Sequence, residues 1–256
     1  MKKILCLFGA LTLVLVSCSS DDENSENLIL PKTVTYKYSD AEGDNDKAVV
    51  LYNGNKIVSA SYSVSDKEVY TYIGDFITKI EDFASEGNIS STNEFTYENG
   101  KLKIDLLTEI SGDHTYISKT VYTHNNDGTI SYVTYSDINT TDENKTSEGV
   151  LTYSNGNLVK KTNNYEGGSS YSKTYEYDTK NNPFKNVLGY NLLIDYDTTV
   201  NLNNVTKMTN VYDNGGAGGS TNVFTYTYEY NDMGYPVKQV ETNLLNDGED
   251  TTEYAY

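Results

Sequence analysis

The chain has little of several residue types on which partners and chemistry often depend. Its 19 basic residues are all lysine, tryptophan is absent, and only 3 prolines, 2 cysteines and 2 histidines occur. Against them stand 37 acidic residues, which give a formal net charge of -18. Without clustered arginine and lysine, this balance excludes nucleic acid as a partner and excludes electrostatic docking on anionic lipids.

Cysteine is confined to Cys6 and Cys18. The rest of the chain therefore has no thiol for a disulfide, a metal site or a nucleophile. A folded chain without disulfides must depend on its apolar core and its sheet hydrogen bonds. We expect one large all-β domain, because the length suits a single core and tyrosine, with 25 copies, is the chief apolar residue.

The first residues have the layout of an export signal. Lys2 and Lys3 precede an apolar run that ends at Val16-Ser17-Cys18 and turns abruptly polar. This predicts a signal peptide over residues 1–17, a flexible tether over 18–31 and a single domain over 32–256. The run is too short to span a bilayer as a stable helix.

Cys18 resembles the lipidated cysteine of a bacterial lipobox, and the serine and acidic residues after it resemble the surface-export signal of Bacteroidetes lipoproteins. The resemblance implies that acyl chains on Cys18 hold the protein at the outer membrane, on the cell surface. The alternative is an ordinary cleaved signal with an incidental cysteine.

A short motif recurs along the chain. A strand ending in tyrosine is followed by Asn-Gly or Asp-Gly and then by an alternating strand, as at Leu51 to Val58. Glycine at such a corner accepts the positive φ of a two-residue hairpin turn. The turn glycines that we predict are Gly54, Gly100, Gly128, Gly156 and Gly234.

The spacing of these units indicates a repeat array of β-hairpins that share one core. Tyrosine alternates with threonine or glutamate in residues 224–230, which places rings on one face of the sheet. The prediction is an antiparallel meander that forms a large curled sheet or a barrel-like shell. One segment near 182–194 breaks the pattern: Asn182 before Pro183 favours one or two helical turns, and a packed loop is the alternative. Its apolar residues should close one end of the sheet.

With these repeats the chain resembles the Tyr-Asp-repeat (RHS-like) β-rich lipoproteins of Bacteroidetes. The residues that carry the resemblance are the Tyr-x-Asn-Gly turns, residues 177–184, residues 203–207 and residues 228–237. The resemblance implies the hairpin architecture. The chain departs from long RHS proteins in its length and in lacking an arginine-rich consensus and a toxin-like C-terminal domain, so a shell around a toxin is not expected.

No catalytic, cofactor or metal site is predicted. His114 and His124 would lie about 33 Å apart along one strand, which is too far to share a metal. The acidic loops 40–46 and 246–250 offer oxygen ligands for Ca²⁺, but neither follows the EF-hand pattern, and solvated turns explain them better.

The leading functional hypothesis is a non-enzymatic surface lipoprotein that binds an extracellular ligand such as a glycan, through tyrosine rings beside polar groups. The alternative is a structural or adhesive module that contacts proteins, for example by strand pairing at free sheet edges. A hydrolase would need converging carboxylates of raised pKa in a deep pocket. A transmembrane barrel would need a uniformly apolar lipid face, which residues 118–123 do not offer.

Overall fold

The fold is given by a computed structural model that describes residues 28–39, 45–62, 66–84, 87–136, 144–194, 201–216, 218–246 and 248–256. The predicted signal peptide, Cys18 and the first part of the tether lie outside these residues. So do residues 40–44 and 247 of the two acidic loops.

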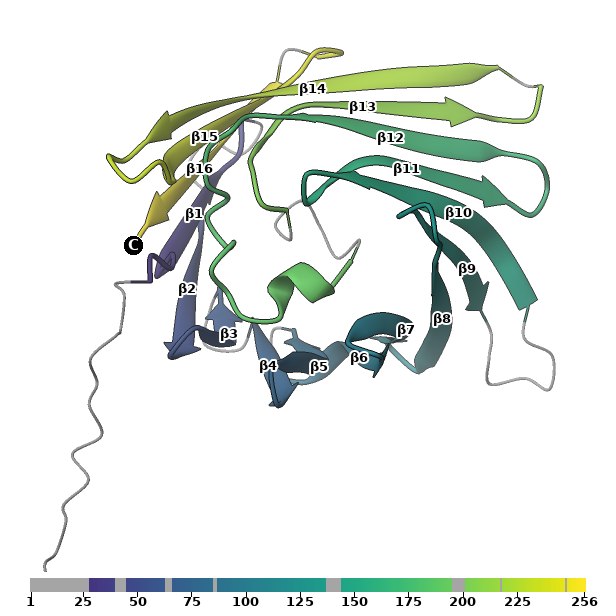
Figure 1. The fold of residues 1–256 in the computed structure, drawn as a ribbon, viewed down its shortest axis with the longest axis horizontal. Coiled ribbons are helices and arrows are strands. Elements are labelled where there is room, and N and C mark those ends of the chain that lie inside the picture. Colours follow the sequence, from purple (N-terminus) through teal and green to yellow (C-terminus); the bar gives the residue numbers. More distant parts are fainter. Residues whose placement is uncertain are drawn as a thin grey trace, which may run out of the picture.

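Almost all of the described chain is β-strand (Figure 1). The strands are β1 (Thr33–Lys37), β2 (Asn45–Asn53), β3 (Lys56–Ser61), β4 (Lys67–Ile73), β5 (Phe76–Phe83), β6 (Ile89–Glu98), β7 (Lys101–Ser111), β8 (His114–His124), β9 (Ile130–Ser136), β10 (Asn144–Ser154), β11 (Asn157–Tyr165), β12 (Ser170–Tyr177), β13 (Val205–Asp213), β14 (Gly219–Tyr230), β15 (Pro236–Asn243) and β16 (Gly248–Ala255). A 3₁₀ helix, η1 (Tyr190–Leu192), is the one helical element among the described residues, and it is far too short to cross a membrane.

The sixteen strands form a closed barrel in which each strand pairs antiparallel with the next along the chain. The ring is completed by β1 and β16, with Val34 opposite Tyr254. The predicted all-β meander is therefore confirmed, and the curled sheet closes on itself. The expectation of two free sheet edges is wrong for the described strands, because closure pairs the first strand with the last.

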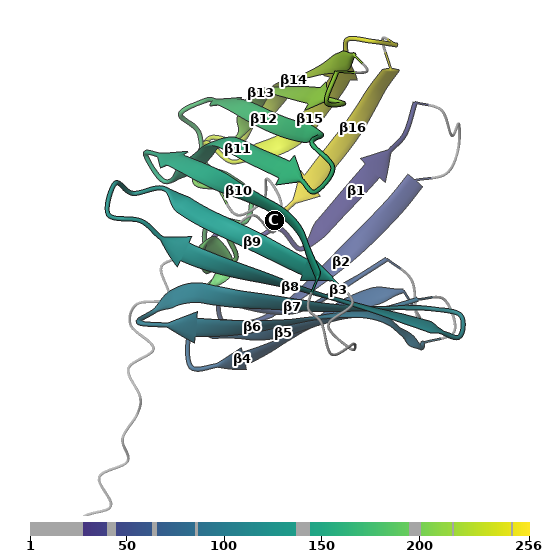
Figure 2. The same ribbon diagram turned by 90° about the vertical axis from the view of Figure 1, so that its right-hand side faces the viewer.

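The strand directions give the barrel two unlike ends. Short connections such as 54–55, 99–100 and 155–156 lie at one end, which we call the tight-turn end. Both the lead into β1 and the end of β16 lie there as well, because β1 starts where β2 stops. All connections that follow an even-numbered strand, including the long connection 178–204, lie at the tight-turn end. The connections that follow an odd-numbered strand lie at the opposite end, the loop end (Figure 2).

The structure places every predicted turn glycine at the tight-turn end with a positive φ. Gly100 follows Asn99, and both have positive φ (75° and 52°), as a type I′ turn requires. Gly54 differs, because Asn53 is the last residue of β2 and Gly54 with Asn55 makes the turn. Only Gly54 of that pair has a positive φ, which is the type II′ pattern.

A β-bulge and a tyrosine recur beside these turns. The register shifts one residue before the tyrosine in β4, β6 and β12, so the facing strand has one extra residue. Tyr97 donates a hydrogen bond from its hydroxyl to the carbonyl oxygen of Ile77, and Tyr177 does the same to Leu158. His124 takes the equivalent place, with its Nε2 at 2.9 Å from the Leu102 carbonyl oxygen. At these three positions the repeat motif thus links a hairpin to the one before it.

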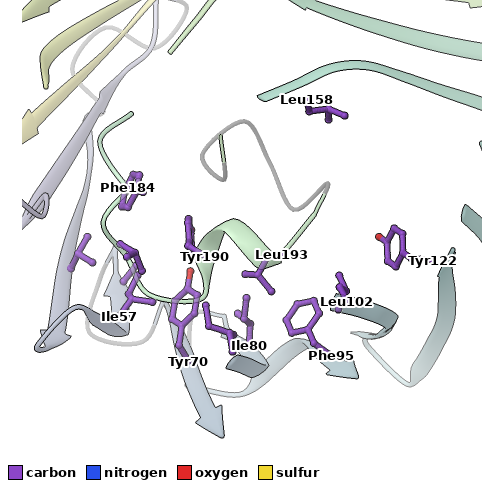
Figure 3. Close-up of a cluster of buried hydrophobic side chains, with 14 of the residues drawn as sticks. Ile57, Tyr70, Ile80, Phe95, Leu102, Tyr122, Leu158, Phe184, Tyr190 and Leu193 are labelled. Atoms are coloured by element: carbon purple, nitrogen blue, oxygen red, sulfur yellow. The ribbon is translucent and has the colours of Figure 1, made fainter. Parts of the chain in front are cut away.

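The chain between β12 and β13 runs inside the barrel (Figure 1). We call its described residues, 178–194 and 201–204, the inner segment. Phe184, Val187, Tyr190 and Leu193 of this segment are buried against the inward side chains of the wall (Figure 3). Each buried side chain of this size contributes about 1.5–3 kcal/mol. The inner segment therefore supplies a core that the wide ring of strands alone would lack.

The predicted helical or loop segment near 182–194 is confirmed, but the helical turn lies later than its signal. Pro183 begins a series of turns, and the helix is η1 at Tyr190–Leu192. Asn182 does accept a hydrogen bond at its side-chain oxygen from the backbone N–H of Phe184, which caps a turn. The segment is fixed at the tight-turn end, where Leu188 N donates to Asn55 O.

Candidate functional site

The candidate site is a cavity in the barrel lumen beside the inner segment. It has a volume of about 370 Å³ and is bounded by β1, β12–β16 and the first residues of the inner segment. Its lining comprises Tyr36, Tyr38, Lys173, Asn182, Pro183, Phe184, Asn204, Val205, Met208, Tyr226, Tyr228, Gln239, Glu241, Asp250, Thr252 and Tyr254. We call it the lumen cavity.

The lining reaches from Asn182 and Val205, near the tight-turn end, to Tyr38 and Asp250 at the loop end. The lower part is closed by hydrogen bonds within the inner segment and from the inner segment to the barrel. Asn182 N donates to Leu202 O, and Asn181 N donates to Gly234 O. The lumen cavity therefore has its floor at the tight-turn end and its upper lining at the loop end.

The chemical composition of the cavity wall follows from the alternation of inward and outward residues along β14, β15 and β16. In residues 225–230 of β14 the residues facing the lumen are tyrosines, including Tyr226 and Tyr228, and those facing outward are threonine and glutamate. On β15 and β16 the inward residues opposite them are polar, with Gln239 facing Thr252 and Glu241 facing Asp250. One side of the cavity thus presents rings and the adjoining side presents amide, hydroxyl and carboxylate groups.

Several of these groups are fixed by bonds that hold their orientation. Tyr228 donates from its hydroxyl to the Val205 carbonyl oxygen at 2.6 Å, and its ring stacks on Tyr230 with centroids 5.7 Å apart. Asp250 accepts a hydrogen bond from the backbone N–H of Ser39 at 2.9 Å. A binding site built on bonded rings and strands is organised before any ligand arrives, which lowers the entropy cost of binding.

Glu241 lies where burial disfavours its ionised form. Burial raises the pKa of Glu241, and the charge of Asp250 raises it further, while a hydrogen bond with Tyr226 opposes the shift. Burial also raises the pKa of Tyr38, with added contributions from the charges of Asp46 and Asp250. The two acidic loops noted in the sequence therefore meet around Tyr38, through one residue of each.

The acidic residues around Tyr38 do not form a metal site among the residues that the structure describes. No group of three histidine, cysteine, aspartate or glutamate side chains there could hold an ion. His114 and His124 lie at the two ends of one strand, β8, so they are well separated along it. His124 contacts a backbone carbonyl and His114 lies beside the Tyr116 ring.

A second, smaller cavity of about 270 Å³ lies on the other side of Phe184. Its lining is more apolar, with Val34, Val50, Ile57 and Tyr190 among its residues. Tyr70 donates a hydrogen bond of 2.5 Å to the one carboxylate of this lining, Glu68. Apart from Glu68, the polar side-chain groups of this lining are tyrosine hydroxyls, whereas the lumen cavity combines hydroxyl, amide and carboxylate groups and is the better candidate for a binding site.

Sequence reasoning missed the lumen cavity as a site. Its residues come from strands that are up to 218 positions apart, from Tyr36 to Tyr254, and they converge only when β1 meets β16. The signal that was present is the tyrosine alternation of residues 224–230, which the sequence assigns first to a core. The structure uses Tyr226 and Tyr228 for both the wall and the cavity lining.

No protein-family model matches the chain, and no curated protein does. Solved structures do match it. A porin-like protein from Bacteroides vulgatus superposes with a TM-score of 0.59 at 16% identity, covering 89% of this chain and 98% of the other. A porin-like protein from Bacteroides uniformis gives a TM-score of 0.51 at 14% identity, covering 88% and 97%. At such identities the likeness shows the barrel fold alone.

Proposed function

We propose that this chain is a lipid-anchored, non-enzymatic protein of the outer membrane whose barrel binds an extracellular glycan in the lumen cavity. The observation that carries the proposal is the composition of the cavity, where five tyrosines adjoin Gln239, Glu241, Asp250 and Thr252. Its volume of about 370 Å³ falls in the range of about 300–1,000 Å³ typical of small-molecule sites.

The chemistry of such a wall suits a sugar. Tyrosine rings offer apolar faces to the C–H faces of a pyranose, and their hydroxyls remain polar. Carboxylate, amide and hydroxyl oxygens accept or donate hydrogen bonds to sugar hydroxyls, and bonds to charged acceptors are the stronger ones. Glu241 and Asp250 face each other across β15 and β16 and could grip one sugar edge together.

The outer face of the barrel supports a location outside the bilayer. Outward positions carry charges near the strand ends, as at Lys37 and Glu253 (2.5 Å apart), and also in the middle of strands, where Lys79 of β5 lies 2.5 Å from Glu81 and Lys119 of β8 lies over the Tyr135 ring. A lysine facing lipid at mid-bilayer costs about 2–4 kcal/mol, and several around the ring would exclude insertion. The names of the two structural neighbours, both porin-like proteins, support a location in the cell envelope. Within it, we propose that Cys18 anchors the chain and that the barrel lies in water.

A relationship to Tyr-Asp (RHS-like) repeats belongs to the same proposal. It is supported by the recurring contact between a pre-turn tyrosine and the bulge carbonyl of the previous hairpin, as at Tyr97 and Tyr177. In this chain the repeats would build a closed barrel around a ligand instead of a long shell.

The alternative function is a structural or adhesive module of the cell envelope. Strand pairing at a free edge no longer supports it, because all sixteen described strands have partners on both sides. An adhesive role would have to use the outer face or the loop end. The lumen cavity favours the binding module.

The test of ligand binding is a glycan array probed with the Cys18→Ala chain, followed by calorimetry on any glycan that binds. Tyr226→Ala should weaken binding about fivefold or more, because truncating an aromatic residue that anchors a ligand costs about 1 kcal/mol or more. The matched control is Tyr116→Ala, a ring on β8 outside the cavity that is 55% exposed. Absence of any glycan above background, or equal losses in both variants, would reject the glycan.

The anchor is tested separately by fractionation of cells. The unaltered chain should sediment with outer membranes, and Cys18→Ala should move to the soluble fraction, because stable attachment depends on acyl chains. A Cys18→Ala chain that stays with the membranes would contradict the lipid anchor.

A further inference from the structure

The tight-turn end of the barrel exposes apolar side chains at several points of its rim. Ile73 ends β4 and is 71% exposed, and Met233 in the turn between β14 and β15 is 62% exposed. Leu202 lies against the turn at Gly156 and is 42% exposed, and Leu28, ahead of β1, is 49% exposed. These four residues, which we call the rim residues, are spread around the ring of strands and do not form one patch.

Apolar exposure alone does not choose between the two ends. Leu245, between β15 and β16 at the loop end, is 70% exposed. Charge separates the ends instead. The eight connections at the loop end contain eleven acidic residues and no lysine in the sequence. At the tight-turn end the connection 178–204 contains three acidic residues and two lysines, and the six short connections contain three acidic residues. Lys56 at the tight-turn end also lies 3.8 Å from one of these three, Asp75.

We infer that the tight-turn end rests on the lipid surface that carries the anchor, with the rim residues in the headgroup region. The inference rests on the anchoring part of the proposed function. A flat surface is contacted by points distributed around a rim, whereas a protein partner is usually contacted through one contiguous patch. The strongly acidic loop end, if it faced the membrane, would be repelled by phosphate groups.

The position of the anchor agrees with this orientation but does not impose it. The described chain begins at Leu28 at the tight-turn end, where Ile29 O accepts a hydrogen bond from Asn186. Leu28 lies ten positions after Cys18, and an extended chain of that length spans about 33–36 Å. Such a reach would let an anchored barrel turn freely, so the rim contact is what sets its direction.

The orientation has a consequence for the lumen cavity. Its upper lining, with Tyr38, Glu241 and Asp250, lies at the loop end and would face away from the membrane. The floor made by the inner segment would face the lipid. A ligand would therefore enter from the aqueous side, past the acidic connections.

The experiment uses an anchor that does not depend on acylation. The chain from residue 18 onward, which contains the whole closed barrel, is made with Cys18→Ser and an N-terminal hexahistidine tag. It is bound to vesicles of phosphatidylcholine and phosphatidylglycerol that contain nickel-chelating lipid. A single cysteine carrying an environment-sensitive dye is placed by Ile73→Cys or by Leu245→Cys, two positions of equal exposure (71% and 70%) at opposite ends.

Brominated acyl chains should quench the dye at position 73 about twofold or more above the dye at position 245, because only the rim enters the interface. Adding Met233→Asp should reduce the quenching at position 73, and circular dichroism of each variant checks that the barrel is intact. Equal quenching at the two positions, no quenching at either, or stronger quenching at position 245 would overturn the inference. None of these outcomes bears on whether Cys18 is acylated or whether a glycan binds.

Discussion

Tyr177 donates a hydrogen bond of 2.6 Å to the backbone carbonyl of Leu158, nineteen residues earlier in the chain. Leu158 is almost wholly buried and lies at the bulge that follows the turn at Gly156. The bond therefore satisfies a carbonyl that the bulge removes from the strand ladder.

Tyr177→Phe should lower the free energy of unfolding by about 1–2 kcal/mol, because it leaves this buried carbonyl without its donor. Urea denaturation followed by circular dichroism measures the change. Tyr116→Phe on the exposed part of β8 is the control and should change stability little. Equal effects would mean that the tyrosine contacts at the bulges do not stabilise the barrel.

Gly189→Ala should destabilise the barrel more than Gly74→Ala, although both glycines have positive φ (77° and 60°). A Cβ at position 189 would lie 2.7 Å from the Asp75 carbonyl oxygen, whereas one at position 74 meets nothing within 4 Å. We expect a loss of about 1 kcal/mol at position 74 from backbone strain and about 2–4 kcal/mol at position 189. Thermal and urea unfolding would measure both, and similar losses would show that the inner segment does not pack tightly on the wall.

Alkaline pH should unfold the barrel. Burial raises the pKa of Tyr72 to about 12, against an opposing hydrogen bond from Ile57 N, and burial raises the pKa of Tyr52 and Tyr228 as well. The unfolded chain loses these protons near the ordinary tyrosine pKa of about 10. Stability is therefore complete below that pH and falls as pH rises from it toward the folded values. Tyrosinate absorbance should rise together with loss of circular dichroism; full ionisation of an intact barrel near pH 10 would contradict this.

Glu241→Gln should stabilise the barrel at neutral pH. The folded state raises the pKa of Glu241, chiefly through burial, so it favours the protonated form. Stability from this site is present below the ordinary glutamate pKa and is lost as pH rises through the folded value. The gain should therefore shrink as pH falls toward 4. Glu229→Gln is the control, because Glu229 is on the outer face with Lys238 3.6 Å away; an equal gain there would count against the lumen as the cause.

The architecture of the strands could be predicted because its signals are local. The alternation of aromatic and polar residues in 224–230 specifies the two faces of a strand. The glycine three residues after Tyr97, Gly100, specifies a turn. Closure could not be predicted, since the pairing of Val34 with Tyr254 depends on how twist and stagger add up over sixteen strands. The position of the helical turn was misplaced for a similar reason: the Asn182-Pro183 signal is local, but Tyr190 and Leu193 are placed by the wall they pack against.

The candidate site could not be predicted either, because it also depends on long-range packing. Tyrosine at alternate positions specifies a buried face, and the sequence cannot separate rings that fill a core from rings that line a cavity. In the barrel Tyr122 is buried in the core beside Tyr132, with ring centroids 6.3 Å apart, whereas Tyr226 lines the lumen cavity. What distinguishes them is the path of the inner segment, which occupies one side of the lumen and leaves the other.

The pairing of the first strand with the last makes biogenesis all or nothing. Hairpins can form one by one as the polypeptide emerges. The seam, which is the pairing of β1 with β16, cannot form until the eight residues of β16 have been made. Until then both seam strands present unsatisfied backbone groups that invite pairing with other nascent chains. A ribosome that stops even one hairpin short would release a protein with an open seam, which quality control could recognise.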